Sequence, residues 1–304
     1  MPPARSPVSP QRRATLAGIG LMLLGVLLFS INDAMGKWLL VTYSVGQMLL
    51  IRSVAALLLL SPLIAREGAG AFAAAPRPGL QALRVLLSTA EVAMFFWAVS
   101  YLPLADTVTF YLAGPIYVTA LSALVLREQV GWRRWSAVLI GFAGVLIALK
   151  PSPATLTWPA LIALAGSFFF AVLMIVTRYL RGTSDLVLAS GQIGATFVFG
   201  AVTAPFGWVM PSLRDYLLMS LLGVIAVFAL MSVNRSLKLA PASVVVPYQY
   251  TLIVWAVVLG YLVFGDVPQP HVLIGSTIII AAGLFIFWRE QVAMGREPPV
   301  VPPP

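Results

Sequence analysis

Apolar residues along the chain form ten long stretches, which are separated by short polar connections. A transmembrane helix needs about 20 mostly apolar residues, and most of the stretches reach that length. The pattern therefore predicts an all-α membrane protein with ten transmembrane helices. The predicted spans cover residues 14–36, 43–64, 82–100, 104–126, 134–149, 157–178, 185–206, 214–234, 243–264 and 270–289.

Composition leaves little of the chain for a surface in water. Hydrophobic residues make up 60% of the 304 residues and charged residues only 10%, whereas about a quarter of a soluble domain is charged. We predict a disordered cytoplasmic tail over 1–13 and a Pro-rich cytoplasmic tail over 290–304. The first apolar run is too long for the core of a signal peptide, so we expect it to be retained. No connection has room for a catalytic domain, and the protein must act within the bilayer or across it.

Positive charge in this chain indicates topology. The formal net charge is +9, but Lys and Arg are spread over the span ends and form no clustered stripe, which argues against nucleic acid as a partner. With the N-terminus inside, fifteen of the nineteen Lys and Arg residues lie on the cytoplasmic side. The exceptions are Lys37, Lys150 and Arg214 outside and Arg52 within a span. The excess predicts that both termini are cytoplasmic.

The residues for metal or nucleophilic chemistry are scarce. The chain has no cysteine and one histidine, His271, which excludes disulfides, thiolate metal sites and cysteine nucleophiles. No phosphate-binding loop and no nucleophile with a convincing base is found. We therefore expect no catalytic residue, no metal and no cofactor, and any transport driven by ATP would need another subunit.

The two halves of the chain are similar to each other. Segment 25–39 aligns without gaps on 166–180, and segment 136–147 aligns on 275–286. Between them, Leu104-Ala105-Asp106 corresponds to Pro241-Ala242-Ser243. We predict a first repeat over 14–150 and a second over 151–289, with chance similarity of apolar sequences as the alternative. Five spans per repeat force the second repeat into the opposite orientation, which is a common construction of secondary transporters.

Four features of the first repeat resemble the EamA repeat. They are Arg52 in the second span, the connection 102–106, Arg127-Glu128 after the fourth span, and segment 136–145 in the fifth. Two copies look like a ten-span member of the drug/metabolite transporter superfamily, with some similarity to the YddG-type amino-acid exporters. The resemblance implies that spans one to four and six to nine surround a central cavity. The second copy departs from the pattern at Gln192 and Ser243, near the positions of Arg52 and Asp106.

Charged side chains inside the spans predict a polar interior, because a charge facing lipid is costly. Glu91 and Arg52 lie at similar depth, so either they form a buried ion pair or Glu91 contacts substrate. Helical spacing places Arg84, Ser88, Glu91 and Phe95 on one face of the third span, which we expect to face the centre. In the first span, Asp33 and Lys37 form an interfacial salt bridge or else act at a gate or on substrate.

Deep aromatic and amide residues are the other candidates for the cavity. Aromatic faces bind organic solutes, and buried phenol and indole groups seek hydrogen-bond partners; ordinary helix packing is the alternative. Proline removes a backbone hydrogen bond, so Pro115 and Pro247 predict bends in spans four and nine, static or involved in motion. We predict substrate contact for Asp33, Glu91, Phe95, Tyr111, Tyr117, Tyr248, Gln249 and Trp255, and structural or gating roles for Lys37, Arg52, Pro115 and Pro247.

Together these features predict a secondary transporter in the cytoplasmic (inner) membrane of a bacterium. Our best sequence-based hypothesis is export of small organic metabolites by alternating access, with aromatic or branched amino acids as cargo. Another metabolite or drug class is the alternative, and a channel or an intramembrane enzyme is a more distant one. The expected partners are the small-molecule substrate and the lipid bilayer. Small residues in spans five and ten predict close packing within the scaffold or in a homodimer.

Overall fold

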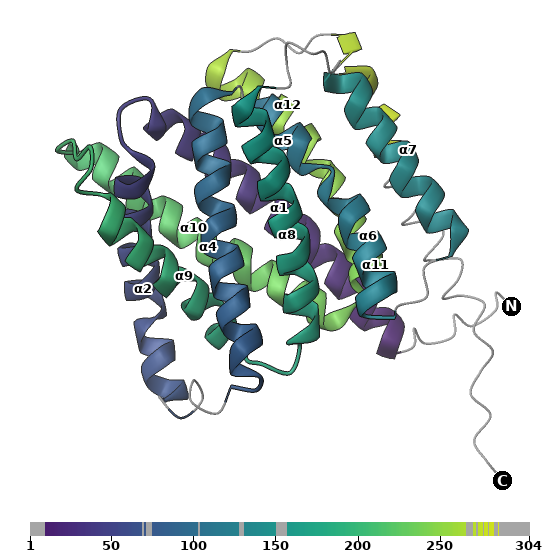
Figure 1. The fold of residues 1–304 in the computed structure, drawn as a ribbon, viewed down its shortest axis with the longest axis horizontal. Helices are drawn as coiled ribbons and strands as arrows, with labels where there is room; N and C mark the ends of the chain where they lie inside the picture. Colours follow the sequence, from purple (N-terminus) through teal and green to yellow (C-terminus); the bar gives the residue numbers. More distant parts are fainter. Residues whose placement is uncertain are drawn as a thin grey trace, which may run out of the picture.

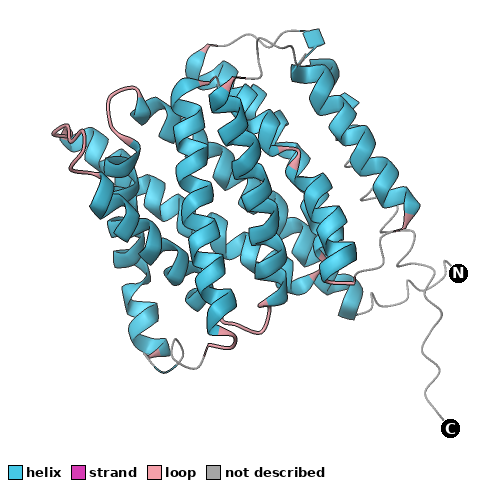
Figure 2. Ribbon diagram, viewed as in Figure 1, coloured by secondary structure: helices cyan, strands magenta, loops and turns pink. Residues whose placement is uncertain are grey.

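The computed structural model describes residues 10–68, 70, 75–102, 104–127, 131–149 and 157–265, together with scattered positions from 270 to 285. This part of the chain is helical and contains no strand (Figure 2). The first half forms α1 (Pro10–Leu40), α2 (Val45–Glu67), α4 (Pro78–Tyr101), α5 (Leu104–Tyr111), α6 (Gly114–Val125) and α7 (Trp132–Leu149). The second half forms α8 (Trp158–Tyr179), α9 (Asp185–Thr203), α10 (Leu213–Leu239), α11 (Ala242–Val245), the 3-10 helix η1 (Val246–Tyr250) and α12 (Thr251–Phe264).

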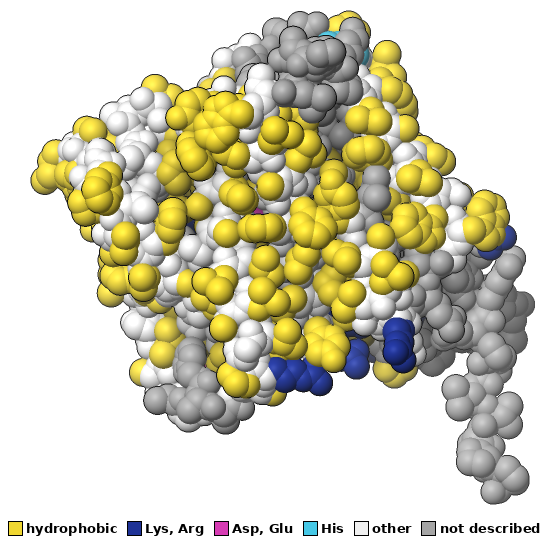
Figure 3. Space-filling model, viewed as in Figure 1, with side chains coloured by type: hydrophobic (Ala, Val, Ile, Leu, Met, Phe, Trp, Pro, Cys, Tyr) yellow, Lys and Arg dark blue, Asp and Glu magenta, His cyan; other side chains and the backbone are white. Residues whose placement is uncertain are grey.

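The helix bundle has the surface of a membrane protein. Among the described residues, seven segments are long and apolar enough to cross a membrane: α1, α2, α4, α8, α9, α10 and η1 with α12. Large apolar side chains point outward, and Leu58, Leu86 and Leu262 are 67%, 68% and 70% exposed. Figure 3 shows such side chains over the middle of one face and several Lys and Arg side chains at its lower edge. Lipid can cover this apolar surface without cost.

The helices begin and end near the predicted span limits. The first helix starts at Pro10, so residues 10–13, which we assigned to the disordered tail, are helical. Helix α9 ends at Thr203, three residues before the predicted end of span seven. The tenth predicted span and both Pro-rich tails lie largely outside the described residues, although a shorter apolar segment is found at Leu273–Ala282. Glu128 and Asp266 of the repeat comparison also lie outside them.

Predicted spans four and nine are interrupted near their prolines. In span four, α5 ends at Tyr111 and α6 starts at Gly114, with Pro115 in its first turn. In span nine, the chain passes from α11 into η1, which has Pro247 in its first turn, and then into α12. Proline lacks the N–H that would continue the helix and is tolerated in a first turn. The predicted bends are therefore present as breaks, whereas a role in motion stays a prediction.

Helices of the two halves pack directly against each other. α1 lies against α10, α2 against α9 and α10, and α4 against α8. A Cβ at Gly223 of α10 would overlap the carbonyl oxygen of Arg52, so only glycine allows α2 and α10 to come this close. The helix of the fifth predicted span, α7, lies at the edge of the bundle beside α6 (Figure 1). Its Gly141 packs against the ring of Tyr250, so this small residue serves packing within the chain.

Candidate functional site

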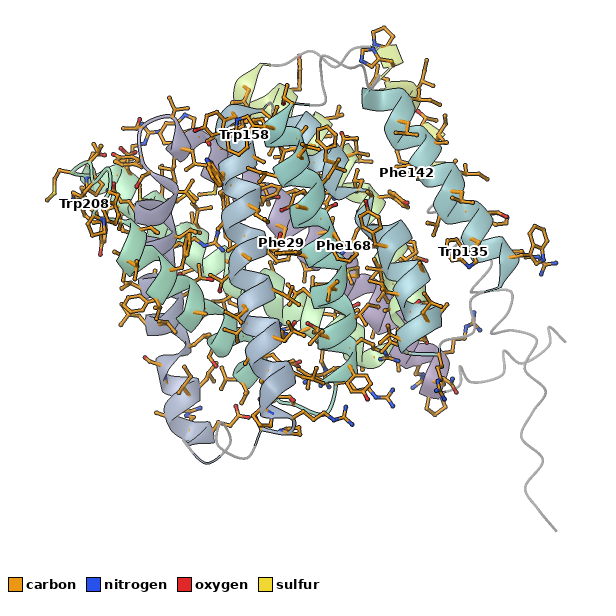
Figure 4. All side chains as sticks on the ribbon, viewed as in Figure 1. Phe29, Trp135, Phe142, Trp158, Phe168 and Trp208 are labelled. Atoms are coloured by element: carbon orange, nitrogen blue, oxygen red, sulfur yellow. The ribbon has the colours of Figure 1, made fainter. Side chains whose placement is uncertain are left out.

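A central cavity lies between the two halves of the bundle. Its volume is about 100 Å³, and side chains from α1, α2, α4, α5, α8, α9, α10, η1 and α12 line it. Phe29, which is labelled among the central helices in Figure 4, belongs to this lining. The repeat alignment matches Leu112 with Gln249, and both line the cavity at the interrupted segments. The breaks of spans four and nine thus expose corresponding positions of the two repeats to the same space.

Two carboxylates and one arginine form a charged group in this cavity. Asp33 of α1, Glu91 of α4 and Arg52 of α2 all belong to the lining, and Arg52 interacts electrostatically with both carboxylates. Within the described part of the chain, however, no ion pair joins Arg52 to Glu91. Arg52 donates a long hydrogen bond of 3.5 Å from Nη1 to Oδ1 of Asn32, and its guanidinium lies 5.5 Å from the centre of the Phe96 ring. Of the two alternatives for these residues, the direct Glu91–Arg52 ion pair is therefore not formed, because equal depth does not fix the direction in which each side chain points.

Arg84 is held by neutral groups of the second half. Its Nε donates to Oγ1 of Thr177 at 2.9 Å, and its Nη1 donates to the carbonyl oxygen of Leu188 at 2.8 Å. Its Nη2 donates to Oε1 of Gln192 at 3.3 Å and to Oδ1 of Asn234 at 3.1 Å. The residue is only 2% exposed. One side chain of α4 is thereby tied to α8, α9 and α10, all of them in the second repeat.

Aromatic rings form the apolar side of the cavity. The rings of Phe95 and Tyr111 meet edge to face at 5.0 Å, and those of Phe95 and Phe96 at 5.3 Å. The Tyr111 hydroxyl donates to the backbone carbonyl of Glu91 at 3.2 Å. This hydrogen bond holds the end of α5 against the middle of α4, beside the charged group. A cavity with one aromatic side and several polar groups suits an organic solute.

The structure places the predicted site residues in two groups. Asp33, Arg52, Glu91, Phe95, Tyr111 and Gln249 line the cavity. Tyr117, Tyr248 and Trp255 are not among the lining residues, and substrate contact by them stays a prediction. Tyr117 packs edge to face on Phe168 of α8, with the ring centres 5.7 Å apart, while Tyr248 and Trp255 belong to an apolar cluster that includes Val118.

The direction of each side chain around its helix decides which of these residues line the cavity. Successive residues of a 3-10 helix are about 120° apart, so Tyr248 and Gln249 of η1 cannot both face the cavity. Lys37 also lies away from the lining, 5.8 Å from the centre of the Phe264 ring. Asp33 belongs to the cavity wall rather than to an interfacial bridge with Lys37.

Four polar cavity residues were absent from our predicted site. They are Asn32, Arg84, Gln192 and Asn234. Arg84 belonged to the predicted polar stripe of span three, and Asn234 and Gln192 are polar residues inside apolar spans, so a signal was present for these three. Asn32 is also a polar residue inside an apolar span, but nothing in the sequence indicated its partner. Its Nδ2 donates to the carbonyl oxygen of Leu222 on α10 at 2.9 Å, a contact that only the packing of α1 on α10 creates.

Comparison with known proteins gives the family. A model of the EamA-like transporter family matches residues 16–150 and again residues 157–288. The chain belongs to the EamA-like transporter family. The two matches cover both halves of the chain, and they make this multi-pass protein a transporter of small metabolites in the drug/metabolite transporter superfamily. The names of the family and of similar proteins point to a transporter and away from an enzyme.

Several curated proteins are similar over most of their length. An S-adenosylmethionine uptake transporter of Rickettsia bellii is 26% identical over 92% of this chain and 96% of that protein. Another S-adenosylmethionine uptake transporter, from Rickettsia prowazekii, is 26% identical over 93% of this chain and 96% of that protein. A riboflavin transporter of Vibrio cholerae is 29% identical over 72% of this chain and 74% of that protein. A solved crystal structure has the same fold, with a TM-score of 0.70 and 16% identity over 92% of this chain and 98% of the other.

Proposed function

We propose that this EamA-family member is a secondary transporter of zwitterionic metabolites that carry a flat ring, with S-adenosylmethionine as the leading candidate. In this proposal ten transmembrane helices form two inverted repeats, both termini are cytoplasmic, and alternating access opens the central cavity to each side in turn. The observation that carries the proposal is the mixed lining of the cavity. It combines carboxylates, guanidinium groups, amides and aromatic rings at the boundary between the repeats.

The polar stripe of α4 favours an elongated solute. Arg84 and Glu91 are seven residues apart on one face of this helix, which corresponds to roughly 10 Å along its axis. S-adenosylmethionine has an amino-acid group at one end, a sulfonium in the middle and an adenine ring at the other end. In this proposal its sulfonium lies near Asp33 and Glu91 and its ring lies against Phe95 and Tyr111. The names of the Rickettsia relatives agree with this choice.

Amino-acid export, our sequence-based hypothesis and the specialty of the YddG-type exporters, is a second candidate. Free phenylalanine would fit the aromatic wall, but its ammonium and carboxylate groups are attached to the same carbon, so it can contact only one end of the polar stripe at a time. Riboflavin, named in another set of relatives, would use the rings and amides but leave the charged residues without counter-charges. Both are therefore weaker candidates. The relatives' names also favour uptake over export.

Counterflow in liposomes tests the proposal. Liposomes with purified protein are loaded with unlabelled S-adenosylmethionine, and entry of the labelled compound is measured without ATP. We expect saturable entry above that of empty liposomes, with weaker competition by riboflavin and phenylalanine. Glu91→Gln should lower the rate at least about tenfold, because a charge-assisted contact is worth about 1.5–3 kcal/mol. Glu67→Gln is the matched control, because Glu67 is exposed at the end of α2, away from the cavity.

Each outcome has a distinct meaning. Saturable counterflow of riboflavin or phenylalanine, without counterflow of S-adenosylmethionine, would support the transporter function and reject S-adenosylmethionine as its substrate. Flux that does not saturate, with single-channel currents, would show a channel. Chemical conversion of the solute would show an enzyme. Equal rates for Glu91→Gln and Glu67→Gln would remove Glu91 from the substrate site.

A further inference from the structure

Arg84 has no carboxylate partner, although it lies in the same cavity as two acidic residues. All four of its hydrogen bonds go to neutral oxygen atoms, and no acidic side chain within the described part of the chain lies within ion-pair distance of it. The other cavity arginine, Arg52, is different, because Asp33 and Glu91 act on it electrostatically. A buried guanidinium with only neutral partners keeps a strong attraction for an anion.

Asn234 adds a free donor at the same place. Its Oδ1 accepts from Arg84, and because a guanidinium can only donate, this contact fixes the orientation of the amide. The Nδ2 group is then left over. It is buried and has no hydrogen-bond partner among the described residues, although Asn234 is 2% exposed and lines the cavity. A buried donor without a partner is costly, which is a reason to expect that a ligand supplies the acceptor.

We propose that Arg84 and the Nδ2 group of Asn234 bind the carboxylate of the transported solute. This inference rests on the proposed function and assigns one end of the substrate. A carboxylate has two oxygen atoms, so one can accept from the guanidinium and the other from the amide. The sulfonium of S-adenosylmethionine then lies toward Asp33 and Glu91, farther along α4. The site prefers solutes with an amino-acid group over the same molecules without the carboxylate.

The site also connects binding with the contact between the repeats. Arg84 belongs to the first repeat and its four partners to the second. A carboxylate that draws Nη2 away from Gln192 weakens one of these contacts as it binds. The substrate thereby weakens the hydrogen bonding between α4 and the second repeat. In the proposed transport cycle the two repeats move relative to each other at this contact.

The test compares two ligands that differ in one group, S-adenosylmethionine and its decarboxylated form. In competition for counterflow, we expect the decarboxylated compound to be at least about tenfold weaker against the wild type, the range of a charged hydrogen bond. Asn234→Asp places a carboxylate beside Arg84 and fills the site from within the protein. It should abolish or reverse the preference. Gln11→Glu is the control, since it also turns a side-chain amide into a carboxylate but lies exposed at the start of α1, outside the cavity lining, and it should keep the preference.

A second readout separates this inference from the proposed function. The unfolding temperature of the purified protein is measured with each of the two ligands, which requires no transport. Stronger stabilisation by S-adenosylmethionine without counterflow would support the carboxylate site and reject the transport of this solute. Counterflow with equal affinity for both ligands would overturn the carboxylate site but leave the proposed transport function in place. The same would follow if the ratio of the two affinities were unchanged in Asn234→Asp. Neither counterflow nor preferential stabilisation would overturn both.

Discussion

Replacement of Gly200 by alanine tests how closely α2 and α9 must pack. A Cβ at Gly200 would lie 2.6 Å from the backbone nitrogen of Leu50 and 2.8 Å from its Cα, whereas ordinary contacts begin at 3.4 Å. The difference, 3.4 minus 2.6, means that the helices must part by about 0.8 Å. The obstacle is backbone, so no side-chain rotation relieves it. We expect Gly200→Ala to destabilise the protein by about 1–3 kcal/mol, as other overpacked interiors do.

Gly194→Ala is the matched control for this change. Gly194 lies six residues earlier on α9, and a Cβ there meets nothing within 4 Å. It should be neutral or stabilising by up to about 1 kcal/mol, because alanine is the better helix former. Unfolding of both purified variants is followed by intrinsic tryptophan fluorescence during heating, and Gly200→Ala should unfold at least about 2 °C below wild type. Counterflow should fall as well, because α2 carries Arg52 into the cavity. Equal unfolding temperatures of the two variants would refute the close packing.

Two further predictions concern the ends of the helices. The Tyr43 hydroxyl donates to the Asp215 carboxylate at 2.7 Å, and this hydrogen bond raises the pKa of Tyr43 above its usual value of 10.0. The contribution of this hydrogen bond to the free energy of unfolding is fully present below pH 10. It is lost as the pH rises through the higher pKa of the folded protein. Tyr43→Phe should therefore flatten the fall in unfolding temperature above pH 10, and an unchanged fall would contradict this role. The chain has no cysteine, so a single introduced cysteine can be labelled without background. Met210→Cys should react with an impermeant thiol reagent on intact spheroplasts, while Arg181→Cys should react only after lysis. The reverse result would invert the proposed orientation.

The position of the helices along the chain was predictable because the length and apolarity of a segment are local properties. The main departures near the ends are small, as in the start of α1 at Pro10. The breaks in spans four and nine were also predictable, since Pro115 and Pro247 act through their own missing N–H groups. The repeat was visible because both copies keep similar residues in the same order, and the family match repeats over the two halves.

The lining of the cavity was only partly predictable. Depth in the membrane follows from counting residues, and it indicated Glu91 and Gln249, which line the cavity. Depth gave no information about direction for Tyr117 and Tyr248, which pack against neighbouring helices. The ion pair of Glu91 with Arg52, one of two alternatives that equal depth left open, is not formed for the same reason. A side chain that reaches a given depth can still point to any of several neighbours.

The sequence by itself determined that this is a helical membrane protein of two similar halves with charged residues inside, since hydrophobicity, spacing and repetition are written along the chain. Only the tertiary structure decided what those charges contact. The partners of Arg84 are Thr177, Leu188, Gln192 and Asn234, which lie 93 to 150 residues away along the chain. They meet because α4 packs against helices of the other repeat, and such contacts depend on the packing of the whole bundle rather than on any local pattern.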